Sequence, residues 1–137
     1  MWGYHINGIW QDVYLLALPK VHIEDIYVKP LVSKNTLEVE VTVQNKTAKK
    51  TDIQLQGNIR EWINCAGTDI NSAPVPTWSL GTEALYVTPH KVSIDANASQ
   101  KVTLQIPVNE NTLKYWTPES PKSICSVTFY TKQKKDY

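Results

Sequence analysis

Two glutamates, Glu38 and Glu40, have the residue type and spacing of an acid–base pair. Residues at i and i+2 of a strand lie on one face, so the two carboxylates would fall within the ~5–10 Å that hydrolysis by paired carboxylates requires. Their neighbours alternate apolar and polar, which predicts a solvated face with nothing to raise the pKa of one member. We therefore interpret both as surface glutamates and assign no catalytic residue in this chain.

The histidines and cysteines are too scattered for metal or nucleophile chemistry. His5, His22 and His90 lie far apart along the chain, and Cys65 and Cys125 form no C-x-x-C pair. The sequence therefore predicts no metal site, and it contains no cofactor motif such as a glycine-rich phosphate loop. A disulfide between the two cysteines and a pair of buried thiols both remain open, because spacing alone cannot place two cysteines within bonding distance.

The aromatic residues are the remaining candidates. Five tryptophans and seven tyrosines stand against one phenylalanine, and tryptophan and tyrosine favour interfaces because each has a polar group on an apolar ring. We consider Trp62 and Trp78 as contacts for a sugar. Interdomain packing or core filling is the other interpretation, and it is favoured for Trp10 and Trp116, which lie near the two ends of the chain.

Charge and hydropathy exclude several classes of partner. The formal net charge is +1, which provides no electrostatic footprint for nucleic acid or an anionic membrane surface. No window approaches the ~18 consecutive apolar residues of a membrane span. The first residues lack the basic and apolar regions of a signal peptide. We expect neither a nucleic-acid nor a membrane partner, and the sequence leaves the localisation undetermined.

The elements that position these residues are predicted to be strands. Apolar and polar residues alternate over residues 37–43, 53–59, 102–106 and 125–129, which is typical of half-buried strands. Residues 21–28 begin in alternation and change phase near Glu24, and this predicts a β-bulge or a change of sheet partner.

Turn signals separate the predicted strands. Polar clusters at residues 33–35, 45–47, 95–98 and 109–111 favour turns. Residues 66–85, with two prolines and two glycines, are interpreted as a long connection containing one edge strand. About seven short strands at this spacing predict an all-β fold, an antiparallel β-sandwich.

Two segments resemble a known family. GIWQDVYL at residues 8–15, followed by PKVHI at 19–23, is similar to the junction in glycoside hydrolase family 2, where the last strand of a jelly-roll domain leads into an immunoglobulin-like sandwich. LKYWTPESP at residues 113–121 is similar to the turn before the last strand of that sandwich. The family includes β-galactosidases, β-glucuronidases and β-mannosidases.

The resemblance implies a division of the chain and a role. Residues 1–19 would be the last strand of a preceding sugar-binding jelly roll, and residues 20–137 an immunoglobulin-like sandwich domain. The family's catalytic glutamates belong to a barrel that would follow Tyr137, so none is carried over and the chain is expected to be inactive alone. The expected role is a scaffold between neighbouring domains of a β-glycosidase, periplasmic or secreted, with subunit contacts in a homo-oligomer left open. A free-standing carbohydrate-binding or protein-interaction module is the alternative.

Overall fold

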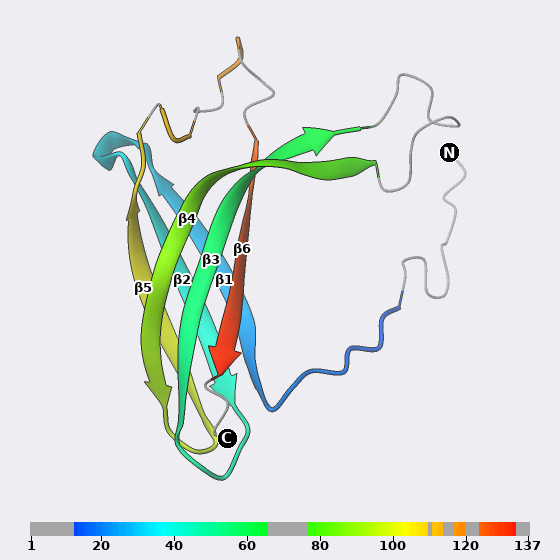
Figure 1. Ribbon diagram of the computed structural model, residues 1–137, viewed down its shortest axis with the longest axis vertical. Helices are drawn as coiled ribbons and strands as arrows, with labels where there is room; N and C mark the ends of the chain where they lie inside the picture. The colour runs from blue at the N-terminus through cyan, green and yellow to red at the C-terminus, as the bar shows by residue number, and fades with distance from the viewer. Residues whose placement is uncertain (1–12, 66–76, 110, 114–116, 120–123, 134–137) are drawn as a thin grey trace, which may run out of the picture.

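The computed structural model describes residues 13–65, 77–109, 111–113, 117–119 and 124–133, and this part of the chain is all-β. A short 3-10 helix, η1 (Val32–Lys34), interrupts a series of strands: β1 (Val21–Leu31), β2 (Thr36–Asn45), β3 (Thr51–Asn64), β4 (Trp78–Ile94), β5 (Ala98–Pro107) and β6 (Cys125–Gln133). They form two antiparallel three-stranded sheets, sheet A in the order β1-β2-β5 and sheet B in the order β4-β3-β6, which lie face to face (Figure 1). The predicted all-β sandwich is confirmed, with six strands in the described residues instead of about seven.

Strand β2 shows how the sequence pattern builds sheet A. Its residues alternate strictly between buried and half-buried positions, and Leu37, Val39, Val41 and Val43 point into the core. It pairs along its whole length with β1 on one side and β5 on the other. A central strand with one apolar face therefore sets the register of the whole sheet.

The predicted phase change in the first strand is a β-bulge. The pairing of β1 with β2 shifts between Ile23 and Asp25, so Glu24 is the extra residue. Beyond the bulge, Ile26 and Val28 lie opposite buried valines of β2 and pack against the core. The bulge thus returns the apolar residues to the inner face after one residue out of phase.

Strand β4 is longer than the sequence pattern indicated. It runs for 17 residues at the edge of sheet B, so the interpretation of residues 78–85 mostly as a connection is wrong, although the predicted edge strand exists. Three register shifts against β3 each place an extra residue in β4. Pro89 lies within the first of these shifts. Proline has no backbone N–H to donate, and it is tolerated here because β4 is an edge strand. Residues 66–76 of that predicted connection lie outside the described residues.

The inner faces of the two sheets form one apolar core. Val39, Val41, Val43, Leu55 and Ile59 are each 0% exposed. Complete burial of a side chain of this size contributes about 1.5–3 kcal/mol relative to exposure. The sandwich therefore follows from aliphatic residues at alternate positions of both sheets, as the sequence predicted.

Asn45, at the end of β2, is a buried polar residue in this core. Its side-chain nitrogen donates to the carbonyl oxygens of Lys49 (2.9 Å), Ile94 (3.2 Å) and Asp95 (3.0 Å). Its side-chain oxygen accepts from the backbone N–H of Thr47 (2.9 Å) and from the hydroxyl of the same residue (2.7 Å). The predicted turn at 45–47 is confirmed, and one amide ties the end of β2 in sheet A to the end of β4 in sheet B and to the turn that follows it.

The other predicted turns also contain asparagines in turn conformations. Asn35 and Asn97 adopt left-handed backbone conformations with φ of 47° and 52°. Asn109 accepts hydrogen bonds on its side-chain oxygen from the backbone N–H groups of Asn111 (2.9 Å) and Thr112 (3.1 Å). Asparagine tolerates the left-handed region and closes such turns with its own side chain, which explains why these clusters end the strands.

Candidate functional site

The carboxylate pair of β2 lies on the outer face of sheet A, bound to a lysine. The Lys29 ammonium is 3.2 Å from a carboxylate oxygen of Glu38 and 2.6 Å from one of Glu40. Lys101 adds a second ion pair to Glu40 at 3.3 Å. Hydrogen bonds from Lys29 and then Lys101 hold the pKa of the Glu40 carboxyl below its usual value, while hydrogen bonds to Glu40 and Glu38 raise the pKa of Lys29.

In hydrolysis by paired carboxylates, one residue acts as the general acid and needs a raised pKa. The lowered pKa of Glu40 makes this pair poorly suited to that role. The two glutamates lie in a charge network on the outer face of sheet A, in agreement with their interpretation as surface residues. The described residues contain no group of three or more histidine, cysteine, aspartate or glutamate side chains able to hold a metal ion. In the same part of the chain, no helix is long and apolar enough to cross a membrane.

The two cysteines lie at different levels of sheet B, and both thiols are free. Cys125 is opposite Glu61 of β3, and Cys65 follows the end of that strand. Cys65 is four residues beyond Glu61, and four residues of extended chain span roughly 13 Å. This distance exceeds the Cα separation that a disulfide allows. Cys65 is half-buried and Cys125 exposed, so the alternative of two buried thiols is wrong. Local desolvation, and then the charge of Glu61, raise the pKa of the Cys125 thiol.

Trp62 and Trp78 lie on a two-stranded extension of sheet B. We call this extension, residues 62–64 of β3 with residues 78–80 of β4, the β3–β4 arm. Strand β6 pairs with β3 only as far as Glu61, and the Trp62 N–H donates to the Ile124 carbonyl oxygen at 2.9 Å. Among the described residues no third strand pairs with the arm beyond this point, and the arm projects beyond the rest of the sandwich (Figure 1). Trp62 is opposite Leu80 and Trp78 is opposite Asn64, which puts both tryptophans on one face as a diagonal pair about 7–8 Å apart.

The structure therefore brings together the two tryptophans that the sequence singled out, and their contact with a sugar stays a prediction. Trp78 is 46% exposed, while Trp62 is half-buried. Trp10 and Trp116, predicted as interdomain contacts, lie outside the described residues.

An arginine fixes the bend where the arm leaves the sheet. Two register shifts, between Ile59 and Arg60 and between Arg60 and Trp62, make β4 longer than β3 at this point. The guanidinium of Arg60 donates two hydrogen bonds to the carbonyl oxygen of Gly81, at 3.0 and 2.7 Å. It thus satisfies a carbonyl of the irregular edge strand, and the strand bends as bulged strands do.

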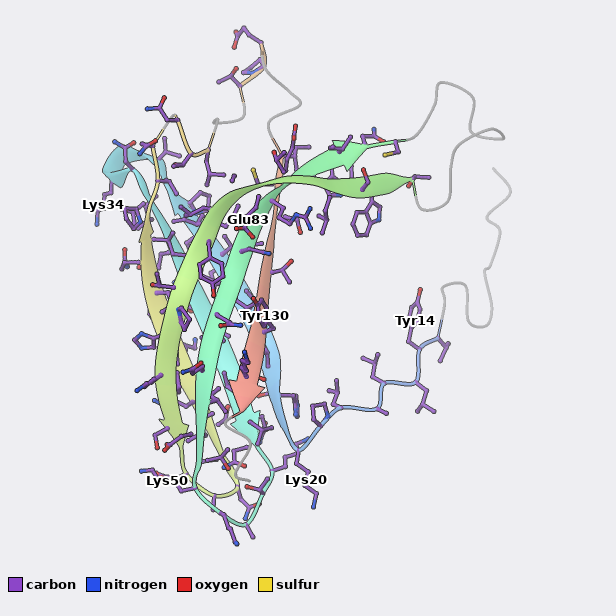
Figure 2. All side chains as sticks on the ribbon, viewed as in Figure 1. Tyr14, Lys20, Lys34, Lys50, Glu83 and Tyr130 are labelled. Carbon is purple, nitrogen blue, oxygen red and sulfur yellow. The ribbon has the colours of Figure 1, made fainter. Side chains whose placement is uncertain are left out.

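A second pair of exposed aromatics, Tyr86 and Tyr130, lies on the outer face of sheet B. Tyr86 of β4 is opposite Asn58, and Tyr130 of β6 is opposite Gln56, the residue two positions earlier in β3. We call these four residues together with Glu83 the tyrosine face. Figure 2 labels two of them, Glu83 and Tyr130, over sheet B, which is the sheet nearest the viewer. The Tyr86 hydroxyl donates to the Gln56 side-chain oxygen (3.4 Å), and the Asn58 amide donates to Glu83 (3.1 Å).

Sequence reasoning missed this face. The alternation of residues 125–129 indicated that Tyr130 points away from the core. Tyr86, however, lies in a part of β4 where the extra residues hide the alternation, so nothing in the sequence connected the two tyrosines.

The segment that leads into β1 has its apolar side chains in solvent. Val13, Tyr14, Leu15, Leu16 and Leu18 are 74%, 75%, 100%, 76% and 59% exposed. Residues 13–19 belong to no strand, and Figure 2 shows Tyr14 on a stretch of chain that runs away from the sandwich. A run of apolar side chains in water usually marks an interaction surface.

Comparison with known proteins adds no family. Neither a scan against protein-family models nor a search of curated proteins matches this chain. The two packed antiparallel sheets and the surfaces described above are therefore the basis for any assignment of function.

Proposed function

We propose that this chain is a non-catalytic, immunoglobulin-like spacer domain of a family 2 β-glycosidase, an enzyme that hydrolyses terminal β-glycosidic bonds. In this role it positions a preceding jelly-roll domain against a following catalytic barrel. The family assignment rests on the two sequence segments at residues 8–15 and 113–121. The observation that carries the spacer role is the exposed apolar segment before β1.

The strand order supports the immunoglobulin-like part of the proposal. Strands β1, β2 and β5 share one sheet, as strands A, B and E do in immunoglobulin domains. Strand β3 pairs with β6 and with β4, as strand C pairs with F and C′.

Residues 13–18 are too apolar to be stable in water as a solvated tail. Five of these six residues carry large apolar or aromatic side chains, and Leu15 is fully exposed. The chain after them is fixed to the sandwich. The Lys46 N–H donates to the Lys20 carbonyl oxygen at 2.7 Å, and the His22 ring contacts the Pro19 carbonyl oxygen at 2.8 Å. An apolar segment leaving a rigid exit point is well placed to complete the sheet of an adjacent domain.

The β3–β4 arm supports the same role. A two-stranded ribbon is marginally stable by itself in water, yet this one exposes Trp78 (46%) and Leu80 (36%) on one face and Ile63 (40%) on the other. Packing of an adjacent domain on the arm would bury these side chains. The diagonal pair of Trp62 and Trp78 favours one second candidate, a free-standing carbohydrate-binding module.

A double substitution, Leu15→Ser with Leu16→Ser, tests the spacer role in the full chain. We expect an unchanged melting temperature together with weaker binding of a hydrophobic dye and less self-association, because these side chains contribute nothing to the sandwich core. Leu55→Ala, in the core, is the control that must lower the melting temperature. A fall of more than about 4 °C in the double variant would show that residues 13–18 pack on the sandwich and would contradict the proposal.

The non-catalytic part of the proposal has its own assay. The chain is expected to release no nitrophenol from nitrophenyl β-galactoside, β-glucuronide or β-mannoside. Turnover above the blank that persists after repurification would overturn it.

A further inference from the structure

We propose that β6 pairs antiparallel with β6 of a second copy of this chain, across a two-fold axis at Phe129. This pairing joins the two copies of sheet B into one continuous sheet. The proposal concerns the edge of sheet B away from β4 (Figure 1). It does not depend on the spacer function.

Half of the backbone groups of β6 face away from β3. In an antiparallel pair, opposite residues alternate between those that exchange both hydrogen bonds and those that exchange none. The Trp62 N–H donates to the Ile124 carbonyl oxygen at 2.9 Å, one step beyond the last pair of the regular β3–β6 ladder. The even-numbered residues of β6 therefore bond to β3, and the odd-numbered ones direct their N–H and C=O groups to the free edge. Within the described residues, no strand pairs with this edge.

Strand β6 lacks the features that protect the other three sheet edges. Natural edge strands avoid unwanted pairing through bulges, prolines and charged side chains. Strand β1 contains a bulge and Pro30, and β4 contains three register shifts and Pro89. Strand β5 carries Lys101 near its middle and ends at Pro107. Strand β6 pairs with β3 without a shift, contains no proline, and has one charged residue, Lys132, next to its end.

The core is also less completely covered on the side of β6. Strand β6 lies across from β1 of the opposite sheet, and these two strands contribute four core-packed residues that are only half-buried: Ile23, Ile26, Val28 and Val127. On the opposite flank, five core residues of β4 and β5 are at most 8% exposed: Val87, Val92, Ile94, Val102 and Ile106. A strand added beside β6 would cover the open flank, which favours an added strand at this edge over the others.

The backbone of β6 matches a second β6 in the proposed register. An axis at Phe129 places Phe129 opposite its own copy and Val127 opposite Thr131. These are odd-numbered residues, so the groups that face the free edge in one copy meet those that face it in the other. A ladder along the whole strand would form about ten hydrogen bonds, two for each pair of such residues.

The side chains on the outer face favour a second copy as the occupant. In this register Thr128 lies opposite Tyr130, a pairing of a β-branched with an aromatic residue that stabilises sheets. Lys132 lies opposite Ser126, so the only charged residue of β6 does not meet its own copy. Isologous pairing requires such self-complementarity, which β6 provides without any like-charge contact.

Amide hydrogen exchange of the full chain at increasing protein concentration tests the proposal, with sedimentation velocity as the measure of mass. The Leu15→Ser, Leu16→Ser variant is used so that residues 13–18 contribute no apolar association. We expect a monomer–dimer equilibrium in which exchange slows at the N–H groups of Val127, Phe129 and Thr131 as the dimer forms. The N–H groups of Thr128 and Tyr130 bond to β3 and should be protected at every concentration.

A charge exchange tests the register. Ser126→Lys places a lysine opposite Lys132 twice in each dimer, and should weaken the dimer about fivefold. Adding Lys132→Glu turns both contacts into opposite-charge pairs and should restore the dimer. Position 126 lies opposite Arg60 of β3 in both variants, so the double variant also controls for that contact. Ser99→Lys, which adds the same charge to the exposed edge strand β5, should leave the dimer unchanged.

Three results would overturn the proposal. The first is a chain that stays monomeric at every concentration, and the second is a dimer that forms without slower exchange at Val127, Phe129 and Thr131. The third is a dimer that Ser126→Lys leaves intact or that Lys132→Glu does not restore. Circular dichroism of each variant ensures that a loss of the dimer is not a loss of fold.

Discussion

Lys29 organises the charged outer face of sheet A. It is bound to both glutamates of β2, at 3.2 and 2.6 Å, and its ammonium also lies over the Tyr27 ring. These side chains remain partly in solvent, so salt screens their attraction and the gain in stability is modest. Hydrogen bonds from Lys29 and then Lys101 lower the pKa of the Glu40 carboxyl, which is the opposite of the shift that a general acid needs.

The pH dependence of stability follows from the shifted pKa values of this network. The Glu40 pKa is lowered from 4.5, so its contribution is present above that pH and is lost as pH falls through the lower, folded-state pKa. The Lys29 pKa is raised from 10.5, so its contribution is present below that pH and is lost as pH rises through the higher value. We expect Lys29→Met to lower stability at pH 7 and to approach the parent protein at both extremes. Urea denaturation of both proteins across this range measures the difference.

Lys50→Met is the matched control for this prediction. Lys50 and Asp95 form an ion pair at 3.2 Å, but their side chains are 64% and 77% exposed. We therefore expect a smaller effect of Lys50→Met at pH 7 than of Lys29→Met. A Lys29→Met effect that stayed constant from acid to alkaline pH would contradict the coupling to Glu40.

At the scale of elements, the pairing of β3 with β6 requires a glycine. A β-carbon on Gly57 would meet the backbone oxygen of Thr128 at 2.6 Å and the Phe129 ring at 2.9 Å. Neither can move easily, since one belongs to the sheet ladder and the other to the core. We expect Gly57→Ala to destabilise the protein by about 1–3 kcal/mol, as overpacking of a core typically does.

Gly81→Ala provides the comparison in the same sheet. A β-carbon there would meet the ends of the flexible side chains of Glu61 (2.8 Å) and Ile63 (3.0 Å), which can move aside. Chemical denaturation should show a clearly smaller loss for Gly81→Ala than for Gly57→Ala. Equal losses would mean that the close packing of Gly57 against β6 is not what excludes a side chain.

The elements differ in how far the sequence could predict them. Strand β2 is buried on one face and regular on both sides, so its alternation appears directly in the sequence. The bulge at Glu24 appears as one change of phase because the alternation resumes after it. In β4, three extra residues and Pro89 break the alternation repeatedly, so most of this edge strand could not be recognised.

The same irregularities limited prediction of the candidate site. Trp62 and Trp78 could be named from residue type alone, but their common face depends on the register of β3 with β4. The contact of Tyr86 with Gln56 also depends on that register, which the extra residues of β4 shift. Long-range register in an irregular edge strand has no local signal in the sequence.

At the scale of the whole molecule, the two sheets are joined through one buried amide as well as through the core. Asn45 belongs to β2 in sheet A, and it binds the carbonyl oxygens of Ile94, the last residue of β4 in sheet B, and of Asp95, which follows that strand. The same side chain closes the 45–49 turn through Thr47 and Lys49. Aliphatic packing has no direction, so a fully satisfied buried amide at this end can fix how the sheets face each other.

Asn45→Ala is therefore expected to cost more than its size suggests. The substitution removes the partner of several backbone groups, and a buried group left without its hydrogen bond costs about 1–3 kcal/mol. Asn45→Asp should be at least as costly, because it places a carboxylate against the three carbonyl oxygens that the amide nitrogen binds. Asn109→Ala removes a similar side-chain-to-backbone pattern at an exposed turn and should cost less, because water replaces the lost partner. Denaturation midpoints for the three variants decide the question: if Asn45→Ala were as mild as Asn109→Ala, the orientation of the sheets would depend on core packing alone.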